Sequence, residues 1–209
     1  MAMTPRELVA LLSRCTAKIR QVSPELNELD GRLGDGDLGA TLEKCARLMD
    51  EGLDASAPDI PSVFNAASMT CVRASGSSFG TLLGVAFFTA AKKSAGKTTL
   101  ENGDIPPLLD DILAALMARG GASLGDKTVL DPLDAVRRAL SETPPGQDFF
   151  PVARRAVKDT LAEFRRKPNK IGRARMFAER SVGLDDPGMV AFSYLVDAAA
   201  GLAINQQEV

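Results

Sequence analysis

Helical periodicity runs through nearly the whole chain and constrains its fold more than any other feature. Thr4-Pro5-Arg6-Glu7 forms a capping box with proline at the first helical position. Apolar residues then recur three and four positions apart, as on one face of a helix: Leu8, Leu11, Leu12, Cys15 and Ile19. No segment alternates cleanly between apolar and polar residues over a strand's length, so the sequence predicts a mainly helical fold.

Similar periodic stretches follow, with proline and glycine between them. A short turn of helix is expected at residues 25–29, and longer helices at about 39–53, 60–73, 78–95, 105–119, 129–142, 149–167 and 187–203. Val85-Ala-Phe-Phe88 is the best strand candidate, but it lies inside a longer apolar run that suits a buried helix. We therefore predict an all-α fold of roughly eight amphipathic helices in a single domain, residues 1–209.

The composition excludes several classes of function. The chain has no histidine, so it cannot supply a phosphohistidine, a histidine base or a histidine metal ligand. Any metal must be bound by oxygen, which favours Mg²⁺, Ca²⁺ or Mn²⁺. No apolar run approaches the roughly 18 residues that span a membrane, and the start lacks the layout of a signal peptide. Cys15, Cys45 and Cys71 are expected to be reduced core residues of a cytoplasmic protein.

An acidic, glycine-rich loop is the strongest candidate site. It reads Leu29-Asp-Gly-Arg-Leu-Gly-Asp-Gly-Asp-Leu-Gly39, with carboxylates at Asp30, Asp35 and Asp37. Three carboxylates on a tight turn supply the oxygen ligands that a hard divalent cation needs, and would repel one another without it. A turn followed by an N-cap would explain one or two of these acids. An EF-hand is excluded, because the spacing differs and no glutamate closes the loop.

Two lysine-containing segments could be mistaken for phosphate loops. Residues 91–98, Ala-Lys-Lys-Ser-Ala-Gly-Lys-Thr, match a relaxed phosphate-loop pattern, but a helix C-terminus with Gly96 as its cap explains them better. Gly125-Asp-Lys-Thr128 precedes a helix, with Thr128 and Asp131 spaced as in a capping box. Lys127 is either a phosphate ligand or, more commonly for such a residue, a solvated lysine.

Three other polar clusters are candidates for phosphate binding or for helix starts. Residues 74–81 form a small-residue loop that opens a helix, where a phosphate site and a simple serine-rich cap are both open. The basic stretch 165–180 has almost no aromatic residues and the net charge of the chain is −2. Phosphate capture by one arginine, or docking of an acidic partner, is therefore favoured over nucleic acid, and most of these charges are expected to be solvated. Asp185-Asp-Pro-Gly188 is expected to start the last helix.

Together these segments resemble the nucleotide-binding L subunit of dihydroxyacetone kinase, which also forms the C-terminal domain of single-chain, ATP-dependent dihydroxyacetone kinases. The matching motifs occur in order: Leu29-Asp30, Gly34-Asp-Gly-Asp37, Ala74-Ser-Gly76, Gly80-Thr81, Gly125-Asp-Lys-Thr128, Gly172-Arg-Ala174, Glu179-Arg-Ser-Val-Gly183 and Asp186-Pro-Gly188. The resemblance implies a barrel of about eight antiparallel helices with the nucleotide at one end.

The resemblance also implies roles for individual residues. Asp30, Asp35 and Asp37 would hold two Mg²⁺ ions against the phosphates of ADP or ATP, and Arg173 would reach a phosphate in the same catalytic site. The implied nucleotide contacts are Leu38, Gly39, Ala40, Thr41, Ala74, Ser75, Gly120, Val129, Arg173, Asp186, Pro187 and Gly188. Of these, Gly120 and Val129 would border the adenine, and the last three residues would close over the nucleotide.

The implied activity needs a partner. In this family a separate K-type subunit holds dihydroxyacetone or a related keto-sugar such as erythrulose, and the L subunit passes it the terminal phosphoryl group. The donor is either exchangeable ATP or a bound ADP that a phosphohistidine M-type subunit of the sugar phosphotransferase system rephosphorylates. No nucleic acid or membrane partner is expected, and a homodimer is left open.

Leu38 departs from the family, which has histidine after Gly-Asp-Gly-Asp. An apolar side chain can neither bond a phosphate nor move a proton, so either that histidine is dispensable or the acceptor differs. Two other functions therefore stay open. One is a regulatory module that senses ADP or ATP and docks a protein partner, and the other is a structural bundle stabilised by Ca²⁺.

Overall fold

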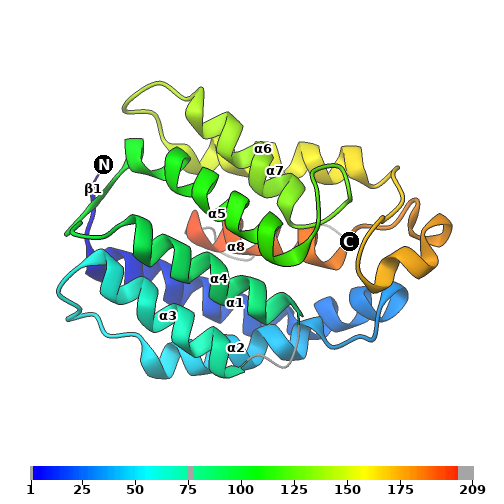
Figure 1. Ribbon diagram of the computed structural model, residues 1–209, viewed down its shortest axis with the longest axis horizontal. Coiled ribbons are helices and arrows are strands. Elements are labelled where there is room, and N and C mark those ends of the chain that lie inside the picture. Colours follow the sequence, from blue (N-terminus) through cyan, green and yellow to red (C-terminus); the bar gives the residue numbers. More distant parts are fainter. Residues whose placement is uncertain (1, 75–77, 202–209) are drawn as a thin grey trace.

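Eight α-helices follow one another in the computed structural model, which describes residues 2–74 and 78–201 (Figure 1). Their bounds are α1 Pro5–Leu33, α2 Leu38–Gly52, α3 Ile60–Ala74, α4 Ser78–Lys93, α5 Ile105–Gly120, α6 Leu130–Ser141, α7 Phe149–Phe164 and α8 Pro187–Ala199. Three short 3₁₀ helices lie between them: η1 Asn102–Asp104, η2 Arg173–Phe177 and η3 Glu179–Ser181. The predicted all-α class is confirmed.

The helices form a closed ring. Each helix packs on the next along the chain, and α8 packs on α1, which completes the circle. The helices lie roughly along the long axis of the molecule, which is horizontal in Figure 1. Four clusters of buried apolar side chains fill the space between neighbouring helices. The barrel implied by the resemblance is therefore present, and the loops at its two ends are free to form sites.

Helix α1 is longer than predicted. The sequence suggested a helix through Ile19 and a separate turn at residues 25–29, but α1 runs unbroken to Leu33 with Pro24 inside it. A proline at this position removes the hydrogen bond to the carbonyl of Arg20. The hydroxyl of Ser23 lies 3.4 Å from that carbonyl oxygen and can donate to it. The prediction of two segments was wrong because tertiary packing and this local donor compensate for the proline.

A two-residue antiparallel bridge, which the sequence did not predict, joins the start of the chain to the segment after α4. In it, β1 (Ala2–Met3) pairs with β2 (Leu100–Glu101). Alternation cannot reveal strands of two residues, so the sequence gives no sign of them. Val85–Phe88 lies inside α4, as expected from the length of its apolar run.

The false phosphate loop is a helix end, as predicted. Helix α4 stops at Lys93, both lysines of its last turn are exposed, and Gly96 has a left-handed φ of +79°. The amide of Ile60 donates to the carbonyl oxygen of Lys97 at 3.1 Å, so this segment also anchors the start of α3. None of the helices among the described residues is long and apolar enough to cross a membrane.

Candidate nucleotide and metal site

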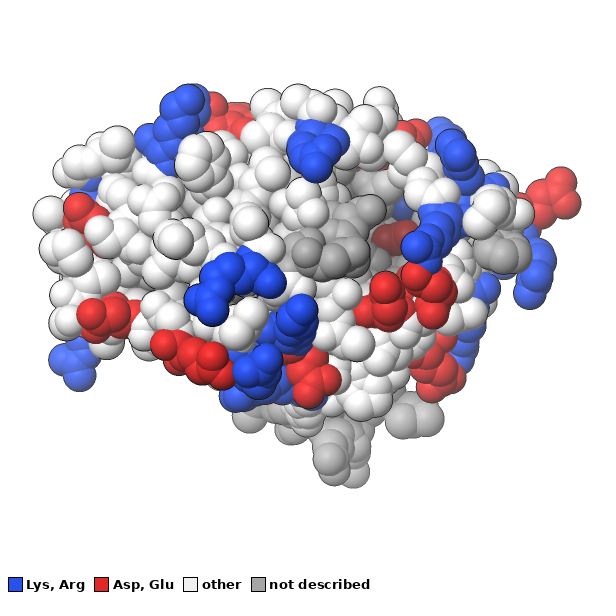
Figure 2. All heavy atoms as spheres, turned by 60° about the horizontal axis from the view of Figure 1, so that its bottom comes forward, with Lys and Arg blue, Asp and Glu red and all other residues white. Residues whose placement is uncertain are grey.

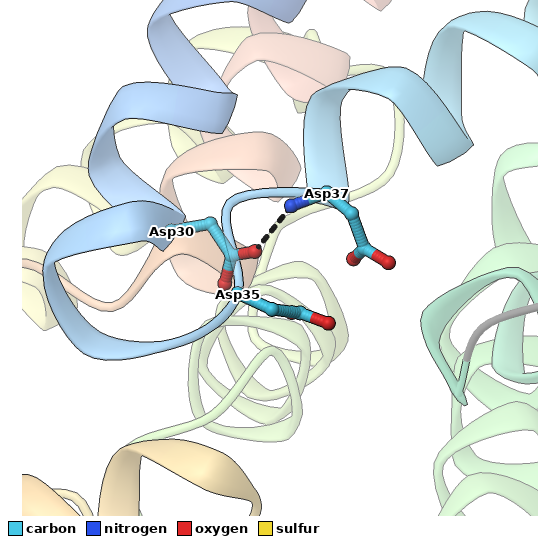
Figure 3. A group of neighbouring side chains, drawn as sticks. All are labelled: Asp30, Asp35 and Asp37. Atoms are coloured by element: carbon cyan, nitrogen blue, oxygen red, sulfur yellow. Dashed lines mark hydrogen bonds between the residues drawn. The ribbon is translucent and has the colours of Figure 1, made fainter.

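Three carboxylates meet where α1 gives way to α2. Asp30 lies in the last turn of α1, Asp35 lies in the connecting loop and Asp37 directly precedes α2, and their side chains border a common space (Figure 3). One ligand oxygen from each lies within 4.8 Å of the other two. Opposite oxygens on Mg²⁺ are about 4.2 Å apart, and on Ca²⁺ about 4.8 Å. The three acids can therefore converge on a divalent cation with little side-chain movement.

Asp30 also caps the helix that follows. Its Oδ2 accepts hydrogen bonds from the amides of Asp37 at 3.0 Å and Leu38 at 3.3 Å. Asp37 is in the N-cap position, yet within the part of the chain that the structure describes its side chain makes no capping hydrogen bond. The capping role that the sequence allowed for one or two of these acids thus belongs to Asp30, while the carboxylate of Asp37 points into the common space.

The glycines give the loop its shape. Gly36 has a φ of +75°, a conformation that other residues rarely adopt. A Cβ atom on Gly39 would lie 1.9 Å from the carbonyl oxygen of Ser23, so α2 approaches α1 closer than any side chain would allow. This close approach brings Asp37 next to Asp30 across the two helices.

Arg173 joins the acids from a distant part of the chain. It is the first residue of η2, and its guanidinium forms an ion pair with the carboxylate of Asp35. Both side chains remain largely exposed, 63% for the arginine and 41% for the aspartate. The site therefore combines three acids with an exposed arginine, whose long side chain can turn toward a phosphate.

The start of α2 is already partly occupied by protein contacts. The amide of Ala40 donates to Oδ1 of Asn27 at 3.0 Å, and that of Thr41 donates to the carbonyl oxygen of Asp37. Leu38 is only 8% exposed and packs among apolar residues of α1, α2 and α8. Phosphate contacts from Leu38, Gly39, Ala40 and Thr41 stay predictions, and Leu38 faces the core. Asn27 was not singled out from the sequence, because nothing marks a lone asparagine inside a helix.

The remaining residues implied for the nucleotide are spread over four elements. Ala74 is buried at the end of α3, and Ser75 lies outside the described residues. Gly120 is exposed at the end of α5, and Val129 directly precedes α6. Their roles at the phosphates and the adenine are untested and stay predictions.

Asp186 starts α8, as the sequence predicted. Its Oδ2 accepts from the amide of Met189 at 3.0 Å, and its Oδ1 accepts from Nδ2 of Asn169 at 2.8 Å. Loss of solvent around the carboxyl raises the pKa of Asp186 to about 6, although these hydrogen bonds oppose the shift. Pro187 is buried in the first turn, and a Cβ on Gly188 would lie 3.2 Å from the ring of Phe79.

Lys127 is neither a phosphate ligand nor a solvated lysine. Its side chain is fully buried, and Nζ donates to the carbonyl oxygens of Lys167, Ser181 and Leu184, each at 2.8 Å. Burial lowers the pKa of Lys127, while the charge of Asp186 opposes that shift. Both expectations for this lysine were wrong, because sequence cannot show that three carbonyls from a later segment converge on it.

The basic stretch 165–180 is mixed with acids rather than forming a uniform positive surface. Lys167 pairs with Glu163, and the guanidinium of Arg165 donates to the carbonyl oxygen of Gly183 at 2.9 Å. Figure 2 likewise shows basic and acidic side chains interspersed over the face that it presents. Ion pairs and backbone hydrogen bonds therefore engage part of the charge of this stretch.

The fold and the site together define a helical-ring protein with an acidic loop suited to a divalent cation and an arginine beside it. A model of the DAK2 domain matches residues 32–201, and the chain belongs to the DAK2 domain family. The predicted family is confirmed.

Two curated relatives and one solved structure show how the family is built. The chain is 32% identical over 190 residues to the "PTS-dependent dihydroxyacetone kinase, ADP-binding subunit DhaL" of Lactococcus lactis, covering 89% of this chain and 91% of the relative. It is 30% identical over 199 residues to the human triokinase/FMN cyclase, covering 92% of this chain but only 34% of that protein. The dihydroxyacetone kinase of C. freundii, solved with AMP-PNP and Mg²⁺, superposes with a TM-score of 0.72 at 24% identity, over 92% of this chain and 33% of the kinase.

Proposed function

We propose that this chain is the nucleotide-binding subunit of a dihydroxyacetone kinase. It would hold ADP or ATP with Mg²⁺ and pass the terminal phosphoryl group to dihydroxyacetone, or a related keto-sugar, on a separate K-type subunit. The observation that carries the proposal is the convergence of three acids and Arg173 at one end of the ring. Its support from relatives is a match along 91% of a subunit named as ADP-binding.

The residues divide the work of phosphoryl transfer. Asp30, Asp35 and Asp37 would hold Mg²⁺, which neutralises phosphate charge when it is bound. Arg173 would leave Asp35 when the cation takes that carboxylate, and its planar guanidinium would then pair with phosphate oxygens. Positioning and charge neutralisation supply most of phosphoryl-transfer catalysis, so a chain without histidine can perform this half of the reaction.

Two finer points belong to the proposal. We favour two Mg²⁺ ions, as the resemblance to the family implies; the three acids would share them with the phosphate oxygens and water, which would complete both coordination shells. We also favour a phosphohistidine M-type subunit as the donor, since the Lactococcus relative is named as dependent on the sugar phosphotransferase system. The proposed compartment is the cytoplasm, where ATP is available.

Leu38 fits this function through its burial. A side chain that packs in the core takes no part in proton movement, so transfer would depend on the acids, the cation and Arg173. The sugar subunit would supply the base that accepts the proton of the acceptor hydroxyl. The departure from the family's histidine therefore does not remove a group that this mechanism uses.

The test combines binding and turnover. Mg-ADP should raise the melting temperature of the chain by mass action, and Ca²⁺ alone should not reproduce that shift. A coupled assay with a cognate K-type subunit, dihydroxyacetone and either Mg-ATP or a phosphorylated M-type subunit should yield triose phosphate. Binding of Mg-ADP without turnover from either donor would instead support the regulatory module, and no nucleotide binding at all would refute both.

A further inference from the structure

The ammonium group of Lys127 sits at a point where two stretches of chain come together. Its three hydrogen-bond acceptors at 2.8 Å are the carbonyl oxygens of Lys167, Ser181 and Leu184. An ammonium has three protons and no acceptor capacity, so this arrangement uses it fully. Lys167 lies at the start of the segment 167–184, and Ser181 and Leu184 lie at its end.

Other hydrogen bonds join the same two stretches. The amide of Gly183 donates to the carbonyl oxygen of Arg165 at 2.7 Å, and the amide of Asn169 donates to the hydroxyl of Ser181 at 2.9 Å. Segment 167–184 is thus a loop with a tightly bonded base. We call Lys127, Asn169 and the three carbonyls bound by Lys127 the lysine clamp.

Asn169 links the clamp to the start of α8. Its side chain is 2% exposed, and Nδ2 donates both to the carbonyl oxygen of Lys127 at 2.9 Å and to Oδ1 of Asp186 at 2.8 Å. Lys127 itself has a φ of +64°, the one non-glycine residue with positive φ among residues 2–74 and 78–201. A lysine held in this uncommon conformation and without solvent indicates a specific structural demand at this position.

Arg173 lies in the loop that the clamp closes. It begins η2, between the two bonded stretches, and reaches across to Asp35 on the loop between α1 and α2. The segment around it contains only the short helices η2 and η3, which have little regular structure to hold an arginine in place. Apart from the contact of η2 with α1, the placement of Arg173 therefore depends on the base of its loop.

We propose that Lys127 is a positioning residue that holds Arg173 where it can contact the nucleotide phosphate. This inference rests on the proposed function, in which Arg173 makes that contact. The ammonium of Lys127 makes none of its hydrogen bonds with the acids or with Arg173, so its effect on Arg173 would pass through the loop that it closes. The acids are held separately, by α1 and α2, so cation binding does not depend on the clamp.

A double-mutant cycle tests the proposal on the full chain. The affinity for Mg-ADP is measured by calorimetry for the wild type, Lys127→Met, Arg173→Ala and the double variant. We expect each single variant to weaken binding about tenfold, and the double variant to bind no worse than Arg173→Ala, because the lysine acts through the arginine. Lys97→Met, which removes a half-exposed lysine paired with Asp104, is the matched control and should bind as the wild type does.

A second readout separates positioning from general loss of structure. Mn²⁺ binding to the acids without nucleotide, followed by electron paramagnetic resonance, should be unchanged within twofold in Lys127→Met. Hydrogen exchange should rise at the amides of Asn169 and Gly183 and stay unchanged in α1. If Lys127→Met does not fold, Asn169→Ala replaces it in the same cycle, with an expected threefold loss that again disappears in the Arg173→Ala background.

The outcomes distinguish the two proposals. A wild type that does not bind Mg-ADP would contradict the proposed function itself. If the wild type binds Mg-ADP and the affinity loss of the double variant equals the product of the two single losses, the positioning role is overturned and the proposed function is not affected. A folded Lys127→Met that binds Mg-ADP as tightly as the wild type would overturn it too, as would an Arg173→Ala variant with unchanged affinity.

Discussion

The acidic loop and the lysine clamp differ in where they place charged side chains: the loop leaves its carboxylates exposed or half-buried, and the clamp buries its ammonium. Asp30, Asp35 and Asp37 crowd like charges at one end of the ring, and although Asp30 caps α2, the carboxylate of Asp37 makes no capping hydrogen bond among the described residues. The clamp buries one positive charge and satisfies it with three carbonyl oxygens and the nearby charge of Asp186. The difference suggests that the first group is retained for a ligand and the second for the fold, which variants can test.

The largest expected effect is on ligand binding in the acidic loop. Asp37→Ala should weaken Mg-ADP binding more than a hundredfold, on the order of 3 kcal/mol, because it removes a cation ligand. Its side chain caps no helix within the described residues, so the melting temperature without ligand should stay equal or rise. Calorimetry and circular dichroism measure the two. Global unfolding of this variant would make the acid structural and erase the contrast with the clamp.

In the lysine clamp, a substitution should reduce the stability of the fold, which Asp37→Ala should not do. Lys127→Met leaves one buried carbonyl, that of Ser181, and two partly buried ones without their donor, so we expect a loss of about 3 kcal/mol in the free energy of unfolding. Lys97→Met removes only a half-exposed ion pair and should cost less than about 1 kcal/mol. Urea titrations of both variants give the values. Equal costs for the two lysines would show that burial of Lys127 contributes nothing special.

A third variant asks whether the helix start next to the acids also has a structural role. Gly39→Ala would place a methyl group against the carbonyl oxygen of Ser23, and separating α1 from α2 should cost about 2 kcal/mol. Gly103→Ala is the control, since a Cβ there meets nothing within 4 Å. A melting temperature for Gly39→Ala that matches the control would contradict the close approach of the two helices.

The smallest effect near neutral pH concerns the pH dependence of Asp186, next to the clamp. Its pKa in the fold is about 6, above the usual value of 3.8, so the folded state binds this proton more tightly than the unfolded state. Its contribution to stability is therefore complete only below the unfolded pKa of about 4 and declines as the pH rises through 6, by about 3 kcal/mol in total and by about 1 kcal/mol between pH 5 and 7. Urea unfolding at pH 4, 5, 6 and 7 should show wild type losing stability relative to Asp186→Asn. A constant difference would refute the raised pKa.

Helix periodicity was enough to predict the class of the fold, but not all its boundaries. The capping box at Thr4 and the apolar spacing of residues 8–19 describe local physics, so they are visible in the sequence. The separate turn expected at residues 25–29 is part of α1, which runs through Pro24 with the Ser23 hydroxyl close to the carbonyl oxygen of Arg20. Ring closure between α8 and α1 depends on contacts between the two ends of the chain, which only the resemblance implied.

The candidate site was predictable where the residues are close in sequence. The three acids share one loop, and the structure brings them together. The resemblance named Arg173 as a phosphate ligand, but spacing alone gives no reason for its pairing with Asp35. Lys127 and Asn169 were misjudged or missed, because a lysine in a turn and an asparagine in a basic stretch are usually exposed, and their burial depends on three separate segments.

Ring closure has a consequence for how the chain folds. Among the described residues, the ring is made by the packing of each helix on the next in sequence, whereas the seam between α1 and α8 joins opposite ends of the described chain. The guanidinium of Arg14 spans this seam and donates to the carbonyl oxygens of Ala198 at 3.3 Å and Ala199 at 3.2 Å. Local contacts form early and distant ones late, so the seam should close last. Side chains such as Arg14 would then slow unfolding far more than they speed folding.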